Sequence, residues 1–270
     1  MEKLNLNPLG LSVSAYDPLA SAKMRADTLN ASEGTLKGYE CKKCKNRGFF
    51  AKYREDGSLY MEDCSCIRTR KCIREMEESG LKESIRTLTF DAYVCKHPWQ
   101  TTLKEAAQSY ANSKTGWLLM GGQSGCGKTH LCTAVCRQRL LDGDEVRYMP
   151  WREKIAELKA LSLDSEHRTR LMDRYKQAQV LYIDDLYKCG KTKDGSAHPS
   201  FHDINLAFEI INYRYINKLR TLISTERTPE ELVAIDEATG SRIIEMCEQH
   251  VYAIGKSQEK NYRLRSVVCL

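Results

Sequence analysis

Short apolar runs and amphipathic stretches alternate along the second part of this chain. The apolar runs have the length of buried strands, and longer stretches with helical periodicity separate them. Strands that alternate with helices predict right-handed crossovers and a mostly parallel sheet. We therefore expect an α/β fold with about five strands, at residues 116–120, 146–149, 180–183, 221–224 and 251–254.

The stretches between these runs predict four helices, at residues 129–142, 151–178, 200–218 and 229–249. The third shows the pattern most clearly, because its apolar residues recur at spacings of three and four. They are Ile204, Ala207, Phe208, Ile211, Tyr215 and Leu219. Ser200 and Asp203 form the kind of capping box that begins a helix. For Arg214 in the same helix, a charged site residue and a solvated position fit the pattern equally well.

The first part of the chain has a different composition. Residues 1–36 are rich in Asn, Ser, Gly, Pro and Ala, and we interpret them as a tail with a short helix near residues 19–29. Two strand-like runs flank Asp56-Gly57, a typical hairpin turn, and a charged helical stretch follows them. We therefore predict a tail at 1–36, a cysteine-rich module with a linker helix at 37–86, and an α/β domain at 87–270.

Composition and charge narrow the class of protein. A length of 270 residues allows about two domains. No apolar run approaches the ~20 residues needed to cross a membrane, and the first residues lack the pattern of a secretory signal. We expect a cytoplasmic protein that binds no membrane, with 12 cysteines that serve as reduced thiols and a metal site rather than as disulfides. The net charge of +6 allows an anionic partner without requiring one.

A phosphate-binding loop follows the first apolar run. Residues 122–129 read Gly-Gln-Ser-Gly-Cys-Gly-Lys-Thr, which matches the Walker A pattern in full. Its glycines let backbone amides turn toward phosphates, and the next helix directs the positive end of its dipole at the same oxygens. Lys128 is placed for the β- and γ-phosphates and Thr129 for Mg²⁺. We predict ATP or ADP contacts from Gly122, Gln123, Ser124, Gly125, Cys126, Gly127, Lys128, Thr129 and His130.

Two carboxylates come directly after the third apolar run. Asp184 and Asp185 follow Val-Leu-Tyr-Ile, the pattern of a Walker B strand. Such carboxylates are costly to bury unless a metal or cation pairs with them. We expect Asp184 to hold Mg²⁺ and Asp185 to orient the attacking water. The fourth run ends in Ser224 and Thr225, which are placed either to contact the γ-phosphate or to cap the next helix, and we group Thr225 with the catalytic candidates.

Cys41-x-x-Cys44 and Cys64-x-Cys66 predict a zinc site. Two cysteine pairs at the ends of a hairpin can converge on one tetrahedral Zn²⁺, which supplies folding energy that a module of about 40 residues cannot obtain from its core. The second pair has one intervening residue instead of the usual two, and Cys72 is a spare that could replace a member of it. Free thiols or a labile disulfide are the alternative, which leaves the clustering of the cysteines unexplained.

The order of these motifs resembles that of the DnaC/DnaI-type helicase loaders, which are AAA+ ATPases. The resemblance covers residues 87–270 and, less sharply, the cysteine region. It rests on the segments GQSGCGKTHL, LYIDDL, FEIINYRY, TLISTE, EATGSRIIEM and NYRL. It implies a three-layer AAA+ core that follows a small zinc module. It also implies that Arg242 is an arginine finger for a neighbouring copy, and that Arg263 is the sensor II arginine.

The resemblance further implies a function in DNA replication. Loaders of this type use ATP to place a DnaB-type hexameric helicase on single-stranded DNA, and we expect a homo-oligomer when ATP is bound. In DnaI-type loaders the zinc module grips the helicase. Here the module is basic, and its Phe49, Phe50 and Tyr53 suit base stacking beside phosphate contacts. A solvated surface without a nucleic-acid partner explains these residues equally well.

Two other functions share the phosphate-binding loop. An IstB-like transposition helper would use the same fold to remodel duplex DNA, and the zinc module argues modestly against it. A small-molecule P-loop kinase would need a substrate-binding insertion, and it gives no role to Arg242 or to the zinc module. DNA-stimulated hydrolysis that depends on protein concentration would favour a loader or a transposition helper, whereas phosphate transfer to a metabolite by the monomer would favour a kinase.

Overall fold

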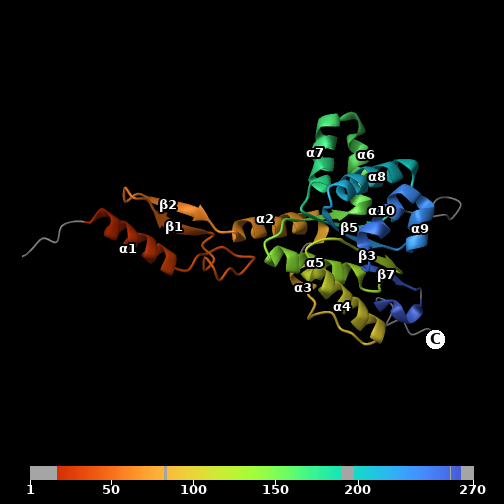
Figure 1. Cartoon of the computed structure of the whole chain (residues 1–270), viewed down its shortest axis with the longest axis horizontal. Helices are drawn as coiled ribbons and strands as arrows, with labels where there is room; N and C mark the ends of the chain where they lie inside the picture. Colours follow the sequence, from red (N-terminus) through yellow and green to blue (C-terminus); the bar gives the residue numbers. More distant parts are fainter. Residues whose placement is uncertain (1–16, 82–83, 190–197, 256, 263–270) are drawn as a thin grey trace, which may run out of the picture. The chain divides into compact units, whose positions relative to one another are not determined.

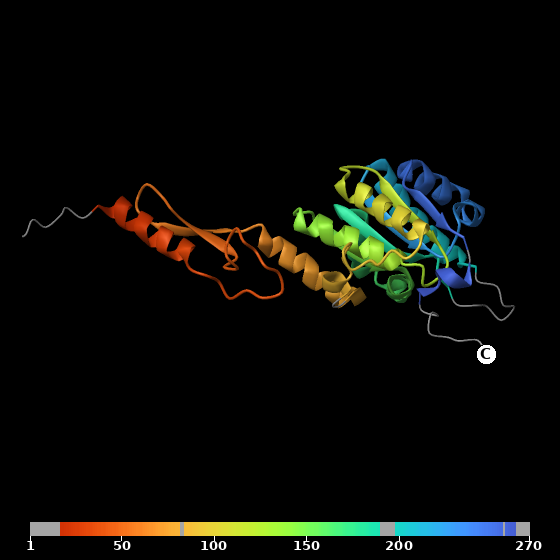
Figure 2. The same cartoon turned by 90° about the horizontal axis from the view of Figure 1, so that it is seen from below.

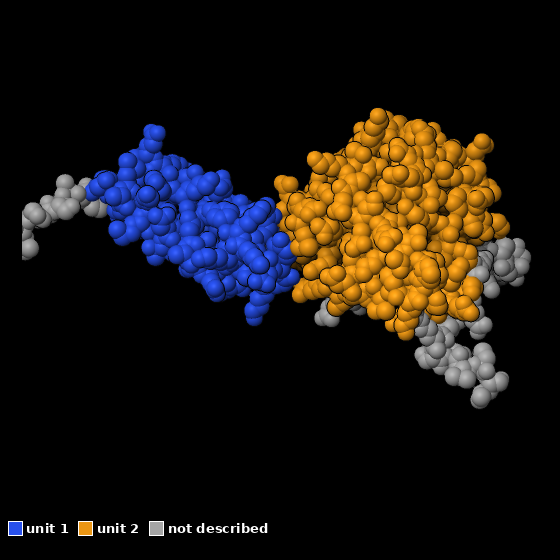
Figure 3. Space-filling view, turned by 60° about the horizontal axis from the view of Figure 1, so that its bottom comes forward, with its two compact units in different colours: residues 1–67 blue, residues 68–270 orange. Residues whose placement is uncertain are grey.

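The chain folds into two compact units, residues 1–67 and 68–270, in a computed structural model that describes residues 17–81, 84–189, 198–255 and 257–262 (Figures 1 and 3). The helix α2 (Cys66–Met76) spans the division, and its second half packs Cys72 and Met76 into the core of the second unit. The division between the two units therefore falls within α2, and the boundary at 86–87 stays a prediction. None of the described helices is both long and apolar enough to cross a membrane.

The first unit packs one helix against one hairpin. α1 (Pro18–Ala31) begins at Asp17, whose carboxylate accepts hydrogen bonds from two backbone amides of the first turn. β1 (Phe49–Tyr53) and β2 (Leu59–Asp63) pair antiparallel across the expected turn. Asn30 joins the helix to β1, because its side-chain amide bonds both the N–H and the C=O of Ala51, at 2.9 and 2.8 Å. The predicted short helix and hairpin are confirmed, and the helix is part of the packed unit.

The second unit is built on a parallel sheet with the strand order β4-β5-β6-β3-β7. Side chains alternate across this sheet, so that Leu118 and Met120 enter one hydrophobic cluster while Trp117 and Leu119 enter the other. The predicted five-stranded parallel sheet is confirmed. Its strands are β3 (Trp117–Gly122), β4 (Val146–Pro150), β5 (Val180–Leu186), β6 (Arg220–Thr225) and β7 (Val251–Ile254).

Helices cover both faces of this sheet and complete three layers (Figure 2). On one face, α2 is joined by the π-helical turn η1 (Glu77–Leu81), α3 (Ser84–Thr87), α4 (Pro98–Asn112) and α5 (Lys128–Leu141). The other face carries α6 (Trp151–Ala160), α7 (Ser165–Lys176), α8 (Phe201–Ile216), α9 (Pro229–Ile235) and α10 (Glu237–Cys247).

Two of the predicted helices are interrupted in the structure. The 3₁₀ turn η2 (Leu161–Leu163) separates α6 from α7, and Asp164 begins α7 by accepting a hydrogen bond from the N–H of His167. Asp236 ends α9 and caps α10 through the N–H of Thr239. Apolar residues recur at helical spacing across the break at Asp236, which explains why a single helix is predicted there, whereas residues 164–170 contain no apolar residue. The two aspartates mark the true helix starts. The prediction has no counterpart of α4, whose buried face is built largely of alanines.

Arg214 is the largest departure from the sequence reading, because its side chain is fully buried. Its guanidinium donates only to groups inside the fold, and burial lowers its pKa to about 9. These contacts join α8 to the end of α7 and to the starts of two strands. The acceptors are the hydroxyl of Thr221 and the carbonyls of Tyr175, Lys176, Ala178 and Arg220. Arg214 is a structural residue of the core rather than a site residue or a solvated position.

Replacing Arg214 by lysine is expected to destabilise the chain by about 2–4 kcal/mol, because one ammonium cannot reach acceptors that the planar fork of arginine serves together. Urea unfolding followed by circular dichroism measures this change. The matched control is Arg170→Lys on the surface of α7, which should stay within about 0.5 kcal/mol of the wild type. Equal unfolding midpoints for the Arg214→Lys variant and the wild type would contradict the structural role.

Candidate nucleotide site and four-cysteine cluster

The predicted phosphate loop connects the end of β3 to the start of α5. Gly122, Gly125 and Gly127 all have positive φ, at 131°, 79° and 98°. These positions also lack room for a side chain. A Cβ on Gly122 would lie 2.5 Å from the carbonyl oxygen of Ile254, and a Cβ on Gly127 would lie 2.8 Å from the ring of Tyr93. Glycine at these positions is therefore a steric requirement of the loop.

Lys128 is buried and folds back into the loop, where its ammonium donates to the carbonyls of Gly122 (2.7 Å) and Gln123 (2.9 Å). A buried ammonium in a ring of backbone dipoles can exchange these carbonyls for phosphate oxygens. The thiol of Cys126 also donates to the carbonyl of Gln123, and burial raises its pKa. Cys126 therefore fills the loop as a neutral thiol and is poorly suited to act as a nucleophile.

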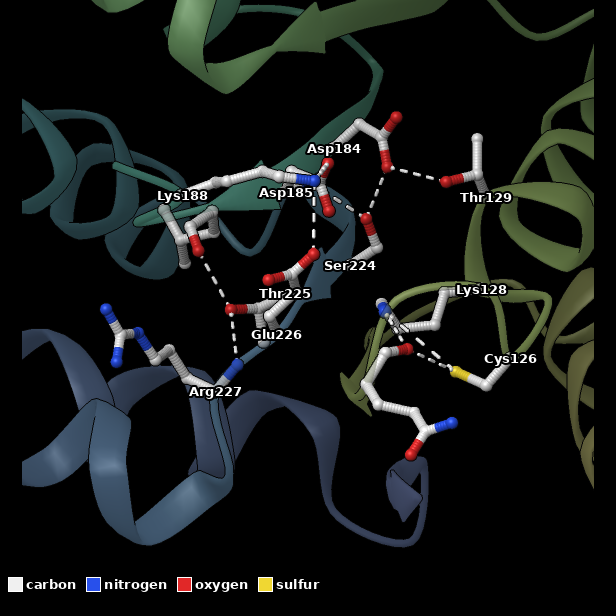
Figure 4. Close-up of polar contacts among 12 residues, drawn as sticks. Cys126, Lys128, Thr129, Asp184, Asp185, Lys188, Ser224, Thr225, Glu226 and Arg227 are labelled. Atoms are coloured by element: carbon white, nitrogen blue, oxygen red, sulfur yellow. Dashed lines mark hydrogen bonds and ion pairs between the residues drawn. The ribbon is translucent and has the colours of Figure 1, made fainter. Parts of the chain in front are cut away.

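The structure brings Thr129 of the loop to Asp184 at the end of β5, with 3.2 Å between the hydroxyl and the carboxylate (Figure 4). Three more hydroxyls donate to the same carboxylate: those of Tyr148 (2.9 Å), Tyr182 (2.6 Å) and Ser224. Hydroxyl and carboxylate oxygens are the ligands that Mg²⁺ prefers. Thr129 and Asp184 therefore form a pair that fits a magnesium ion beside the phosphate loop.

The two tyrosines on Asp184 are residues that the sequence reading missed. Both lie inside apolar strand runs, where the pattern predicts only core packing. Burial raises the pKa of each phenol, and the negative charge of Asp184 raises it further. Tyr148 and Tyr182 therefore stay protonated and act as fixed hydrogen-bond donors that orient the carboxylate.

Ser224 and Thr225, the two hydroxyls at the end of β6, lie in different surroundings. Ser224 donates to Asp184 and accepts from the N–H of Asp185 at 3.0 Å. The hydroxyl of Thr225 is fully buried and donates to the carbonyl of Leu186 at 2.8 Å (Figure 4). Of this pair, Ser224 contacts Asp184 and Asp185, whereas Thr225 holds the turn at the end of β5.

Asp185 adopts a positive φ of 60°, at an irregularity in the pairing of β5 with β6. Its carboxylate forms an ion pair with Lys188 at 2.8 Å, and Lys188 also reaches Glu226 at 3.1 Å. Burial alone would lower the pKa of Lys188, but the hydrogen bonds to the two carboxylates raise it. Asp185 is therefore held next to Asp184 but is aimed at a lysine rather than at the phosphate loop.

A cavity of about 450 Å³ opens over these residues, which is the size of a small-molecule site. The phosphate loop, Asp185 and Lys188 line its polar end. Apolar side chains that include Leu88, Val94 and Trp99 line the remainder. A ligand with a charged phosphate tail and a flat apolar head matches this division of polarity.

Two further segments border the cavity. His130 holds the carbonyl of Thr89 at 2.8 Å and meets the ring of Tyr93 edge-on, so it fastens the loop before α4 to the start of α5. On the other side, Gln123 exchanges two hydrogen bonds with the backbone of Ser257, which precedes the 3₁₀ turn η3 (Gln258–Lys260). The predicted sensor II arginine, Arg263, lies outside the described residues.

Arg242 lies on α10 and is not among the described residues that line this cavity. Its guanidinium donates to the carbonyl of Ala238 at 2.6 Å and lies over the rings of Phe208 and Tyr215, each at 5.4 Å. Within one chain, the structure therefore does not bring Arg242 to the phosphate loop.

In the first unit, the side chains of Cys41, Cys44, Cys64 and Cys66 converge, with all four sulfur atoms within 4.8 Å of one another. The Sγ atoms of Cys41 and Cys64 are 3.8 Å apart, and those of Cys44 and Cys66 are 3.5 Å apart. Zinc–sulfur bonds of ~2.3 Å in a tetrahedron separate the sulfurs by ~3.8 Å, so the spacing fits Zn²⁺. Cys72 lies in the core of the second unit and does not belong to this cluster.

The surroundings of the cluster shift the pKa values of two of its thiols. Burial alone would raise the pKa of Cys44, but hydrogen bonds from the N–H of Gly48 and from the neighbouring thiols lower it to about 7. Asn46 shapes the turn between the first two cysteines, because its side chain accepts from the N–H of Cys41 at 2.8 Å. The thiolate that a metal requires is therefore favoured at Cys44, whereas burial raises the pKa of Cys64.

The sheet, the phosphate loop after β3 and the carboxylates at the end of β5 define an AAA+ P-loop fold. The phage-like element PBSX protein XkdC of Bacillus subtilis is 32% identical over 251 residues, which cover 87% of this chain and 90% of that protein. The replicative helicase loader DnaC of Buchnera aphidicola is 26% identical over 141 residues, 49% of this chain and 56% of that one. A crystal structure of the DnaC helicase loader superposes on 65% of this chain and 99% of that one, with a TM-score of 0.51 and 20% identity, which shows the same fold.

The family model for the bacterial DnaA ATPase domain matches residues 85–246, which is more than half of the chain. The chain belongs to this family of AAA+ ATPases, and it is similar in sequence and fold to the DnaC helicase loaders.

Proposed function

We propose that this chain is an ATP-dependent helicase loader of DNA replication. The observation that carries the proposal is the meeting of Thr129 and Asp184 beside the buried ammonium of Lys128, at the polar end of a nucleotide-sized cavity. Similarity to the DnaC helicase loaders supports the choice of a DnaB-type hexameric helicase and single-stranded DNA as partners.

Different residues of the site bind the phosphates of ATP and its Mg²⁺ ion. Lys128 and the loop amides bind the phosphates, and Thr129 and Asp184 hold Mg²⁺, which supplies charge neutralisation when bound. Ser224 is placed to sense the γ-phosphate, because it already bonds both Asp184 and the backbone of Asp185. Thr225, the other hydroxyl at the end of β6, supports this arrangement because it donates a hydrogen bond to the carbonyl of Leu186.

Hydrolysis needs two further events. Asp185 orients the attacking water once its carboxylate turns from Lys188 toward the γ-phosphate. Arg242 of a neighbouring copy neutralises charge that develops on the transferred phosphate, and the position of Arg242 away from its own cavity favours action in a homo-oligomer. Arg263 is proposed as the sensor II contact.

The first unit serves as a zinc module that binds a partner. The four-cysteine cluster has the spacing that Zn²⁺ requires, and basic residues surround it in the sequence. We propose the helicase as the partner of this unit, and contact of its basic side chains with single-stranded DNA as the alternative.

A pull-down with the host's DnaB-type helicase tests the proposal. The helicase should be retained with ATP and Mg²⁺, and single-stranded DNA should stimulate ATP hydrolysis in a manner that depends on protein concentration. A Lys128→Ala variant should lose the ATP dependence, while Arg137→Ala, farther along α5, should keep it. ATP hydrolysis without helicase retention, or phosphate transfer from ATP to a metabolite, would contradict a loader.

A further inference from the structure

The surroundings of Arg242 are unusual for a charged side chain at a helix surface. Its described partners are one backbone carbonyl, on Ala238, and the faces of two aromatic rings, on Phe208 and Tyr215, with no carboxylate among them. Both rings lie within the ~6 Å at which a guanidinium and an aromatic face attract each other. Among the described residues, the guanidinium is thus held in place without an ion pair to a carboxylate.

The two rings form a shelf that belongs to α8. Phe208 and Tyr215 are seven residues apart, which places them on the same face of that helix, two turns from each other. The hydroxyl of Tyr215 donates to Glu245 on α10 at 2.9 Å, so the shelf is tied to the helix that carries Arg242. Phe208 remains 36% exposed. The shelf and the arginine therefore occupy the surface of α8 and α10, where another molecule can reach them.

We propose that Phe208 and Tyr215 are positioning residues that hold the guanidinium of Arg242 ready for the nucleotide site of a neighbouring copy. The proposal rests on the proposed action of Arg242 on a neighbour. A carboxylate partner would also fix a long arginine side chain, but it would have to be displaced before the charge could meet a phosphate. An aromatic shelf restricts the side chain without that competition, because the ring faces carry no net charge.

Mixtures of two defective variants test this assignment. Asp185→Asn provides a copy with an intact Arg242 and an impaired site, and Arg242→Ala provides a copy with an intact site and no finger. Mixing them should restore ATP hydrolysis, because the arginine of the first serves the site of the second. Phe208→Leu added to the Asp185→Asn copy should reduce the restored rate by about threefold to tenfold, which corresponds to the loss of one cation–π contact.

The same Phe208→Leu change placed in the Arg242→Ala copy should leave the restored rate within about twofold, since there is no guanidinium to hold. A general structural defect would lower the rate from either copy, so the asymmetry is the decisive readout. In the Asp185→Asn copy, Tyr215→Phe, which keeps the ring, should preserve restoration, whereas Tyr215→Leu should reduce it. The matched control is Phe201→Leu in that copy, because Phe201 lies on α8 with 77% exposure and is not among the described rings that pack under the guanidinium of Arg242.

The possible results separate two claims: the positioning role of the two rings and the action of Arg242 on a neighbouring copy. Restoration that is unaffected by Phe208→Leu and Tyr215→Leu in the Asp185→Asn copy would overturn the positioning role and leave the action of Arg242 on a neighbour intact. Equal losses from either copy would also overturn it. No restoration in the unmodified mixture would overturn the action of Arg242 on a neighbour, and the positioning role with it.

Discussion

Replacing Lys128 by alanine is expected to weaken ATP binding by at least about 100-fold and to abolish ATP hydrolysis. The ammonium is buried in the loop and donates to two carbonyls that phosphate oxygens can replace. Two charge-assisted hydrogen bonds at about 1.5–3 kcal/mol each account for at least about 2.7 kcal/mol, which is a 100-fold change in affinity. Calorimetric titration with ATP and Mg²⁺ measures the binding, and phosphate release measures the hydrolysis.

The matched control for Lys128→Ala is Arg137→Ala, which also removes a positive charge from α5 but lies away from the phosphate loop. Its affinity for ATP should equal that of the wild type. Wild-type affinity in the Lys128→Ala variant would show that the loop does not bind phosphates. A loss that is equal in both variants would point to the charge of the helix and not to the site.

Replacing Cys44 by serine is expected to remove zinc from the chain and to unfold the hairpin of the first unit. The four sulfur atoms lie within 4.8 Å of one another, and the unit has few other buried side chains to stabilise it. Structural zinc contributes about 10 kcal/mol or more to the folding of such modules, which far exceeds the effect of an ordinary substitution. Metal analysis of the purified chain and hydrogen exchange of residues 49–63 measure the two effects.

A chelator should reproduce the effect of Cys44→Ser in the wild type, with protection lost in the first unit and retained in the second. Cys95→Ser is the matched control, because it removes an exposed thiol of the second unit and should leave about one zinc per chain. If the wild-type chain carries no zinc, or if the hairpin stays protected with chelator, the cluster is a set of packed thiols.

Local patterns predicted much of the fold and both candidate sites. The phosphate loop is a run of eight residues in which glycines, the lysine and the threonine act on their immediate surroundings, so its spacing alone specifies the geometry. The strands were also predictable, because fully buried parallel strands are continuous apolar runs. The helix break at Asp236 was not, since apolar residues at helical spacing continue across it, whereas the polar run 164–170 is itself a sign of the break at Asp164.

Local patterns could not predict which of Ser224 and Thr225 contacts Asp184. Neighbouring residues of a strand face opposite sides of a sheet, so only one of the two can meet Asp184. The pairing of β5 with β6 shifts between Ile183 and Leu186, and this irregularity brings Ser224 to both carboxyl residues. The residues 221–225 alone do not determine how β6 pairs with β5.

By itself, the sequence determined the class of fold, the phosphate loop and the four converging cysteines, because each is signalled by short local patterns of residues. Only the tertiary structure decided the roles of Tyr148, Ser224 and Arg214. Tyr148 and Ser224 meet Asp184 across 36 and 40 residues of chain, and three of the five acceptors of Arg214 lie 36 to 39 residues away. The order of the strands brings these distant groups together. The pairing of strands is a long-range choice, and an isolated polar side chain in an apolar run gives no local sign of the partner it will meet.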